Sequence, residues 1–142
     1  MKYSVKLSHA VHILVFIYTS EGEPVSSDKI AESIHTNPGC VRQIMSALRK
    51  AELIKSVVGH PKPELAKRPE DISLLDVYKA VEGDKPLLHL DTHTNPECGV
   101  GVNIQLALQS FYDKVQRDAE ESMAGITLKD IIEEFWQRIK NI

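Results

Sequence analysis

Apolar residues recur at intervals of three or four positions along several stretches of the chain, as they do on the buried side of amphipathic helices. The first such stretch covers residues 5–19 and ends at the sequence EGEP. A second, SDKIAESI at residues 27–34, follows Ser26, whose hydroxyl can cap the helix, and places Asp28 in the first turn. The pattern therefore predicts a largely helical N-terminal region.

A third helix is predicted within residues 36–53, TNPGCVRQIMSALRKAEL. Asn37 suits the N-cap and Pro38 the first helical position, where the missing N–H of proline costs no hydrogen bond. The inward apolar positions of this helix and the one before it have the spacing of a helix-turn-helix, in which the small Ala31 lets the second helix cross closely. Those positions are Ile30, Ala31, Ile34, Val41 and Ile44.

The segment after the third helix has the pattern of a β-hairpin. LIKSVV (53–58) is strand-like, GHPKP (59–63) is a rigid turn that carries a cation, and ELAK (64–67) returns. Two short strands placed here are typical of a winged helix, whose wing rests on the DNA backbone or in the minor groove. His60 and Lys62 are the wing residues that could contact DNA, although a surface hairpin without that role has the same pattern.

A capping box formed by Ser73 and Asp76 starts the next predicted helix, ISLLDVYKAVEGD. Residues 84–97 follow as a loop that contains two prolines. We therefore expect the chain to leave the winged helix through an irregular segment.

A long helix is predicted from about Gly99 to Met123, near 35 Å in length at about 1.5 Å per residue. Gly125 ends it, and Thr127 with Asp130 caps a last amphipathic helix. That last helix is predicted to run through Trp136. The apolar seam of the long helix is Ile104, Leu108, Phe111, Val115 and Ala119.

So long a seam in so small a protein is more easily buried against a second copy than within one monomer, although packing within the monomer is the alternative. The predicted fold is mainly α with a small β-wing. We divide it into a winged helix-turn-helix domain at 1–83, a loop at 84–97, and a dimerisation helix with a C-terminal helix at 98–142.

Length and composition limit where the protein works. The 142 residues suffice for one core of ordinary size, and two cysteines cannot build a disulfide framework, which favours a reducing cytoplasm. The apolar run AVHILVFIY contains His12 and lacks a small-residue cleavage site, and no segment approaches the roughly 20 apolar residues of a membrane span. We expect a soluble, cytoplasmic protein without a membrane partner.

Charge is divided unevenly along the chain. Residues 1–68 hold ten Lys and Arg against six Asp and Glu, a net charge of +4, whereas residues 69–142 hold seven against fourteen, a net charge of −7. This asymmetry favours a front half that binds a polyanion, although charged runs are usually solvated faces.

The outward side of the third helix is rich in hydrogen-bond donors. Arginine pairs with guanine, glutamine with adenine, and lysine or serine with phosphate oxygens, so this side is suited to double-stranded DNA. There are two alternatives: a solvated helix face, and a winged-helix adaptor that binds protein through the same face. Salt separates the adaptor from a DNA-binding protein, because DNA binding would weaken steeply as salt rises and binding through an apolar protein interface would not. The outward residues are Pro38, Gly39, Arg42, Gln43, Ser46 and Lys50.

The sequence does not predict an enzyme, because it contains none of the common motifs of catalytic sites. The sequence contains no Ser-His-Asp order, no phosphate-binding glycine loop and no spaced cysteine pair.

The order of these segments resembles the Rrf-type, IscR-like winged-helix transcription regulators of bacteria. The resemblance spans nearly the whole chain, and LAKRPEDISLLDVYKAVEG is its most specific anchor, beside KIAESIHTNPGCVRQIMSALRKAELIKS, NPECGVG and GITLKDII. Within the family the chain looks closest to the YwnA-like branch, which lacks an iron–sulfur cluster.

The resemblance implies a homodimer held by the long helices, a palindromic operator, and usually repression. It assigns DNA contacts to the stretch from Asn37 to Ser46, to Gly59 and His60 in the wing, and to Lys6 and Ser8 at the start of the first helix. The wing VGHPKPELA departs from the glycine-rich wing, with an arginine and a tyrosine, of many members, which puts insertion into the minor groove in doubt.

Members that bind a cluster place three cysteines in and after the loop that here reads LHLDTHTNPECGVG, and this chain retains only Cys98. Thiolates hold iron–sulfur clusters, so we predict no cluster and no other cofactor. His89, His93 and Cys98 could form a mixed site for zinc or ferrous iron, but their spacing matches no strong motif. A metal or a small ligand acting through residues 84–98 remains an alternative signal.

Thiol sensing fits the residues better. Cys98 begins the long helix and Cys40 lies in the first turn of the presumed recognition helix, and a helix N-terminus favours the reactive thiolate form. We predict that Cys98 or Cys40 is an oxidation-responsive switch that weakens operator binding; a small buried apolar residue is the alternative role of a lone cysteine.

Overall fold

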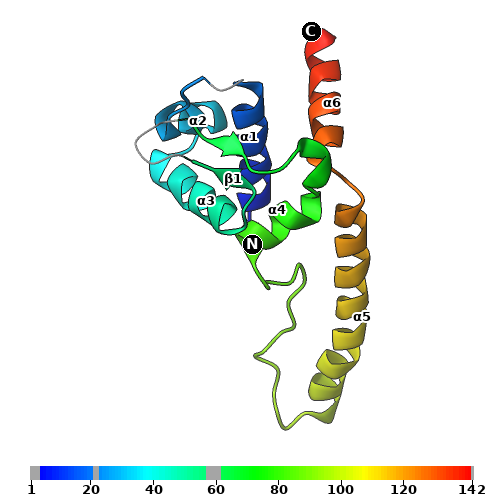
Figure 1. Cartoon of the computed structure of the whole chain (residues 1–142). Coiled ribbons are helices and arrows are strands. Elements are labelled where there is room, and N and C mark those ends of the chain that lie inside the picture. The colour runs from blue at the N-terminus through cyan, green and yellow to red at the C-terminus, as the bar shows by residue number, and fades with distance from the viewer. Residues whose placement is uncertain (1–3, 21–22, 57–61, 142) are drawn as a thin grey trace.

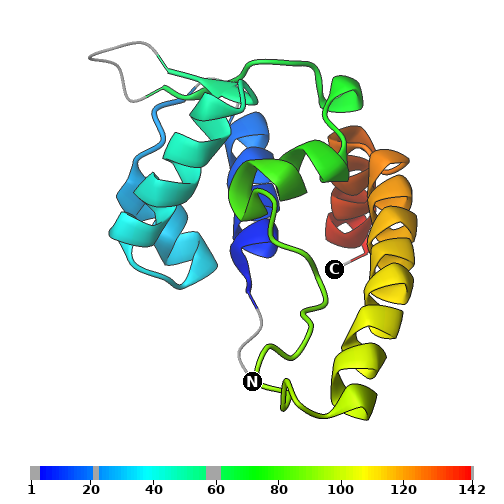
Figure 2. The ribbon, with the colours of Figure 1, turned by 90° about the horizontal axis from the view of Figure 1, so that it is seen from below.

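The computed structural model describes residues 4–20, 23–56 and 62–141. This part of the chain is mainly helical with one small sheet, which confirms the predicted fold class. Its elements are α1 (Lys6–Thr19), α2 (Ser27–Ile34), α3 (Pro38–Lys50), β1 (Ile54–Lys55), β2 (Glu64–Leu65), the 3-10 helix η1 (Pro69–Asp71), α4 (Leu74–Glu82), α5 (Gly99–Ala124) and α6 (Leu128–Lys140). Seen from below, α1 and α4 lie between the α2–α3 pair and the α5–α6 pair (Figure 2).

Both helices of the predicted helix-turn-helix begin at their predicted caps. The Ser26 hydroxyl accepts a hydrogen bond from the Lys29 backbone N–H at 3.2 Å. Asn37 Oδ1 accepts one from the Cys40 backbone N–H at 2.8 Å, with Pro38 at the first helical position. The turn between them passes through His35, which ends α2 in the left-handed region at φ 69°.

One hydrophobic core joins α1, α2, α3 and α4. Four of the five predicted inward positions of the helix-turn-helix are buried, and the fifth, Ile34, is only partly buried at the end of α2. Ala31 is 2% exposed, which confirms that a small residue lies where the two helices approach. The α1 residues that enter the core are Ala10, Ile13, Leu14 and Ile17.

The predicted wing is present as a short antiparallel pair. Ile54 lies opposite Leu65, and Lys55 opposite Glu64. The buried Ile54 anchors the pair in the core, while the ion pair between Lys55 Nζ and Glu64 Oε2, at 3.8 Å, lies on the exposed side. The tip at 57–61 lies outside the described residues.

Two capping boxes stand side by side where the C-terminal part meets the winged helix. Ser73 with Asp76 starts α4, and Thr127 with Asp130 starts α6, as the sequence predicts. Ser73 and Thr127 also face each other in an antiparallel β-bridge. The junction between α5 and α6 is thereby attached to the start of α4.

Helix α5 extends well beyond the winged helix, with residues 84–97 descending beside it (Figure 1). None of its 26 residues, all of which the structure describes, is buried. The helix begins at Gly99 as predicted and ends one residue after Met123, and α6 continues four residues past Trp136. The division at 83 and 97 stays a prediction.

Candidate nucleic-acid interface

Helix α3 has one buried side and one exposed side. Val41, Ile44, Met45 and Leu48 are buried in the core. Arg42, Gln43 and Lys50 are exposed. At about 100° per residue, the exposed residues project away from the core, so their polar groups are presented together on the outer surface.

The start of α3 is a crowded turn. The Asn37 oxygen serves as the cap, and a Cβ added at Gly39 would lie 3.1 Å from that oxygen. Because such a contact is tight, the small residue at position 39 keeps the cap intact. Pro38 and Gly39 are half-buried and Asn37 is exposed, so of these three predicted contacts Asn37 is the most accessible.

Three further predicted contacts lie on α3 and α1. Ser46 is half-buried one turn after Arg42, and Lys6 and Ser8 are exposed in the first turn of α1. Lys6 and Gln43 line the same small cavity of about 90 Å³ between α1 and α3. The structure thus brings Lys6 next to the outer side of α3, whereas Ser8 does not line that cavity.

Of the three predicted wing contacts, the structure describes only one. Gly59 and His60 lie outside the described residues. Lys62 is exposed just before β2.

The sequence reasoning missed two exposed cations of the helix-turn-helix. Arg49 lies in the last turn of α3, and Lys29 lies on α2. The first helix of a helix-turn-helix crosses the DNA backbone, so the position of Lys29 in that helix was the available signal.

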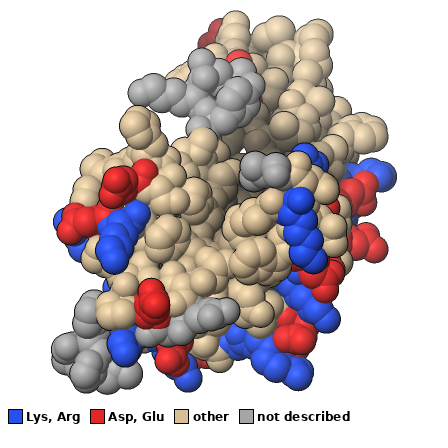
Figure 3. All heavy atoms as spheres, turned by 90° about the horizontal axis from the view of Figure 1, so that it is seen from above, with Lys and Arg blue, Asp and Glu red and all other residues tan. Residues whose placement is uncertain are grey.

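Charge elsewhere is mixed. On the face seen from above in Figure 3, Lys and Arg side chains lie among Asp and Glu on the left, lower and right parts, and other residues form the centre. A polyanion would therefore find little net attraction there, and the donor-rich side of α3 remains the better candidate.

Both cysteines lie at helix starts. Cys98 is the exposed N-cap of α5, where its Sγ lies 3.5 Å from the Gly101 backbone nitrogen. Cys40 is half-buried in the first turn of α3. Their reactivity stays a prediction.

The loop before α5 contains no evident metal centre. Within residues 4–20, 23–56 and 62–141, no three His, Cys, Asp or Glu side chains come together as metal ligands. His89 lines a cavity of about 270 Å³ against α5, while His93 and Cys98 do not. The mixed site of these three residues is thus not assembled in this conformation.

The apolar seam of α5 is open to solvent. Phe111 is 65% exposed, Ile104 49% and Val115 47%, and Leu108 and Ala119 are half-buried at its edge. Within the monomer, only Leu108 and Ala119 of the seam are thus partly covered, and Ile104, Phe111 and Val115 are exposed. No helix in the described part of the chain combines the length and apolar character needed to cross a membrane.

Comparisons with known proteins agree with this geometry. YwnA of Bacillus subtilis (strain 168), a candidate HTH-type transcriptional regulator, is 43% identical over 127 residues, which cover 89% of this chain and 94% of that protein. A crystal structure of a candidate DNA-binding protein is 42% identical, with a TM-score of 0.74, and covers 89% of this chain and 98% of that one. IscR of T. potens is 30% identical, with a TM-score of 0.68, over 94% of this chain and 88% of that one.

The sequence model of the Rrf2 family, described as an iron-dependent transcriptional regulator, matches residues 3–134. These relatives are regulators and not enzymes, and Rrf2-type regulators bind DNA. The resemblance found in the sequence is confirmed: the chain belongs to the Rrf2 family of transcriptional regulators.

Proposed function

We propose that this protein is a homodimeric regulator that binds a palindromic operator in double-stranded DNA, as a repressor, in the bacterial cytoplasm. The observation that carries the proposal is the exposed side of α3, where Arg42, Gln43 and Lys50 project opposite a buried apolar side. In the major groove, arginine can make two hydrogen bonds to the edge of a guanine, and glutamine can make two to the edge of an adenine. Lys50 and Lys6 have the charge and reach to hold phosphates.

The two sides of α5 support the proposed dimer. Its Gln116 and Glu120 side chains contact α4, while Ile104, Phe111 and Val115 lie on another side that is exposed. A second copy would bury this seam from both partners at once, as a two-fold interface does. Two recognition helices related in this way read half-sites about one DNA turn apart, which is why we expect a palindrome. Bound across a promoter, such a dimer would block transcription.

The affinity of the purified protein for the DNA upstream of its own gene, against a scrambled duplex, tests the proposal. We expect selective binding that Arg42→Ala weakens by about tenfold or more, with relaxed preference at one base pair. Arg138→Ala removes the same charge from the exposed side of α6, where Arg138 pairs with Glu134, and should change little. Equal losses in both variants, or equal binding to both duplexes, would favour the protein-interaction adaptor.

We further propose that oxidation releases the operator. Hydrogen peroxide would oxidise the thiol of Cys98 or of Cys40 to a sulfenic acid: one peroxide oxygen is transferred to the sulfur and the other leaves as water. At Cys98 this would add a polar group at the start of α5, and at Cys40 it would add bulk beside the DNA-facing side of α3. Serine at both positions should abolish the response of DNA binding to peroxide; an undiminished response would remove the cysteines from the mechanism.

The iron of the family description does not fit this chain. The loop and the start of α5 supply a single cysteine, Cys98, and the described residues assemble no group of three metal ligands. We therefore propose regulation without a cluster. Protein purified without oxygen should show no absorption band of an iron–sulfur cluster. A small ligand in the cavity beside His89 is the alternative signal, and it would have to alter DNA binding without oxidant.

A further inference from the structure

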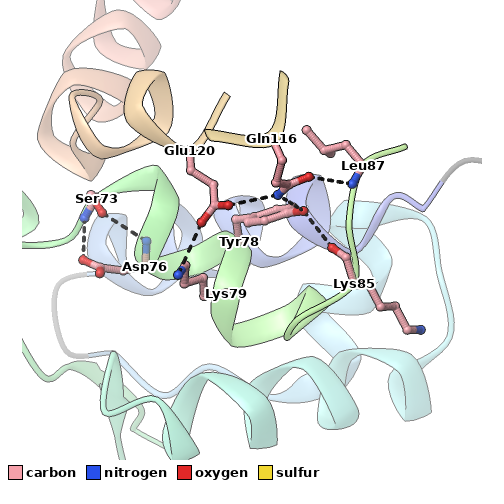
Figure 4. A network of polar contacts seen from close by, with 8 residues as sticks. All are labelled: Ser73, Asp76, Tyr78, Lys79, Lys85, Leu87, Gln116 and Glu120. Atoms are coloured by element: carbon pink, nitrogen blue, oxygen red, sulfur yellow. Dashed lines mark hydrogen bonds and ion pairs between the residues drawn. The ribbon is translucent and has the colours of Figure 1, made fainter. Parts of the chain in front are cut away.

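The side-chain amide of Gln116 lies where α4, α5 and the loop between them meet (Figure 4). Its Nε2 donates to the Tyr78 hydroxyl at 3.3 Å and to Glu120 Oε2 at 3.2 Å. Its Oε1 accepts from the backbone N–H of Leu87 at 2.9 Å. One side chain of α5 therefore contacts both the winged helix and the loop.

The hydrogen-bonding roles in this cluster are determined by its partners. The Tyr78 hydroxyl donates its only proton to the Lys85 carbonyl oxygen at 2.9 Å, so it must accept from Gln116. The Leu87 N–H needs an oxygen acceptor, so the oxygen of the Gln116 amide must point toward Leu87 and its nitrogen toward Tyr78. Tyr78 is only 4% exposed, so its hydroxyl has little access to water as a replacement partner.

The cluster attaches α5 to the winged helix at a second place along the helix. The first is the bridge at the end of α5, where the Leu74 N–H donates to the Ile126 carbonyl at 2.8 Å. One attachment would allow α5 to swing about that point, whereas two define its direction. The ion pair of Lys79 with Glu120, at 3.3 Å, also joins α4 to α5; the Lys79 side chain is 60% exposed and that of Glu120 27%, and ion pairs open to water on one side contribute little.

We propose that Gln116 is a positioning residue that, through Tyr78, sets the direction of α5 against the winged helix and thereby the spacing of the two half-sites. This inference rests on the proposed homodimeric DNA binding. Helix α3 packs against α4, so a swing of α5 relative to α4 moves α3 relative to the partner's α3. A swing of about 10° over a lever of about 20 Å displaces it by about 3.5 Å, the rise of one base pair.

Gln116→Met tests the proposal, because methionine keeps the unbranched length and removes every hydrogen bond of the amide. Gln105→Met is the matched control: Gln105 Oε1 accepts from the Asp91 N–H of the same loop at 3.0 Å, on the same helix, without a contact to Tyr78. Affinity is measured for duplexes that carry the operator half-sites, obtained by selection with the wild-type protein, at spacings from two base pairs shorter to two longer.

We expect the wild-type protein and Gln105→Met to prefer one spacing. In Gln116→Met the ratio of the affinity at that spacing to the affinity at the other spacings should fall by about fivefold or more, while the affinity for a single half-site stays unchanged. An unchanged spacing profile, or an equal loss of affinity at every spacing, overturns the inference. If the wild-type protein selects no sequence, the proposed function fails and the inference with it.

The spread of distances between the two winged helices gives a second readout that needs no DNA. Spin labels at Glu32→Cys, exposed on α2, report it in a dimer whose two native cysteines are serines. Gln116→Met should broaden the distance distribution and Gln105→Met should not. A distribution as narrow as that of the wild-type protein in both variants contradicts the positioning role.

Discussion

Residues in the first turn of α3 cap the helix and are also predicted to contact DNA. Asn37 caps the helix through its oxygen, and the small Gly39 leaves that oxygen room at 3.1 Å from where a Cβ would lie. The same two residues lie at the start of the presumed recognition helix. Changes here should therefore affect stability and DNA binding by separate routes.

Asn37→Ala should lower the free energy of unfolding by about 1 kcal/mol, because it removes the acceptor for the Cys40 N–H. Asn37→Ser retains an oxygen acceptor and should lose much less. Denaturant unfolding of the two variants decides the point. Equal stability of the alanine and serine variants would show that the cap contributes nothing.

His12 gives the fold a dependence on pH. Burial, and then the charge of His9, hold the pKa of His12 below its ordinary value of 6.5. The unfolded chain therefore binds a proton more readily, and the free energy of unfolding should decrease as the pH falls through 6.5 toward the folded pKa. The neutral imidazole Nε2 lies 2.8 Å from Ser33 Oγ, a contact between α1 and α2.

The variant His12→Gln keeps a hydrogen-bonding group near Ser33 and removes the titration. The free energy of unfolding, measured at about pH 7.5 and about pH 5.5, should differ less in this variant than in the wild-type protein. An equal difference in both would assign the pH dependence to other groups.

At the scale of elements, α5 offers a direct comparison between two of its sides. Phe111 is 65% exposed within the predicted seam, and Leu106 is 66% exposed about 140° away around the helix. Both are apolar and equally accessible in the monomer. Any difference between their variants therefore reports what covers each side.

Phe111→Glu should dissociate the proposed dimer, because each of the two copies would place a carboxylate in the apolar interface. Leu106→Glu should leave the dimer intact. Sedimentation of both variants measures the result. A dimer that survives Phe111→Glu, or is lost equally in Leu106→Glu, would place the interface elsewhere.

Much of the fold could be predicted because its signals are local. The caps at Ser26 and Asn37 and both capping boxes follow from residue types three positions apart, and the core of the helix-turn-helix follows from helical spacing. The contact of Gln116 with Tyr78 joins residues 38 apart in the chain. No periodicity signals such a pairing, because a polar residue on an amphipathic helix usually faces water.

The candidate DNA site was predictable to a similar degree. The outward position of Arg42, Gln43 and Lys50 follows from the helical period. The approach of Lys6 to Gln43 depends on how α1 crosses α3, which the sequence pattern does not specify. Lys29 and Arg49 were missed for a related reason, since their distance from the DNA depends on how the whole domain is oriented.

For the whole molecule, the uneven charge suits a protein that approaches DNA from one end. Residues 1–68, which include α1 to α3 and both strands, have a net charge of +4, and the remaining residues have −7. Repulsion of the acidic part by phosphates would favour the orientation with α3 toward the duplex. Binding should then depend on salt through the few cations that meet phosphates.

The central claim is that α3 presents a DNA-reading surface, and the salt dependence of affinity tests it most directly. We would measure affinity for the selected operator and for a scrambled duplex between about 50 and 200 mM salt. We predict tight binding to the operator alone that weakens steeply with salt, with a slope that Lys50→Ala reduces by about one. An affinity that does not change with salt concentration, or that is equal for the two duplexes, would contradict the account.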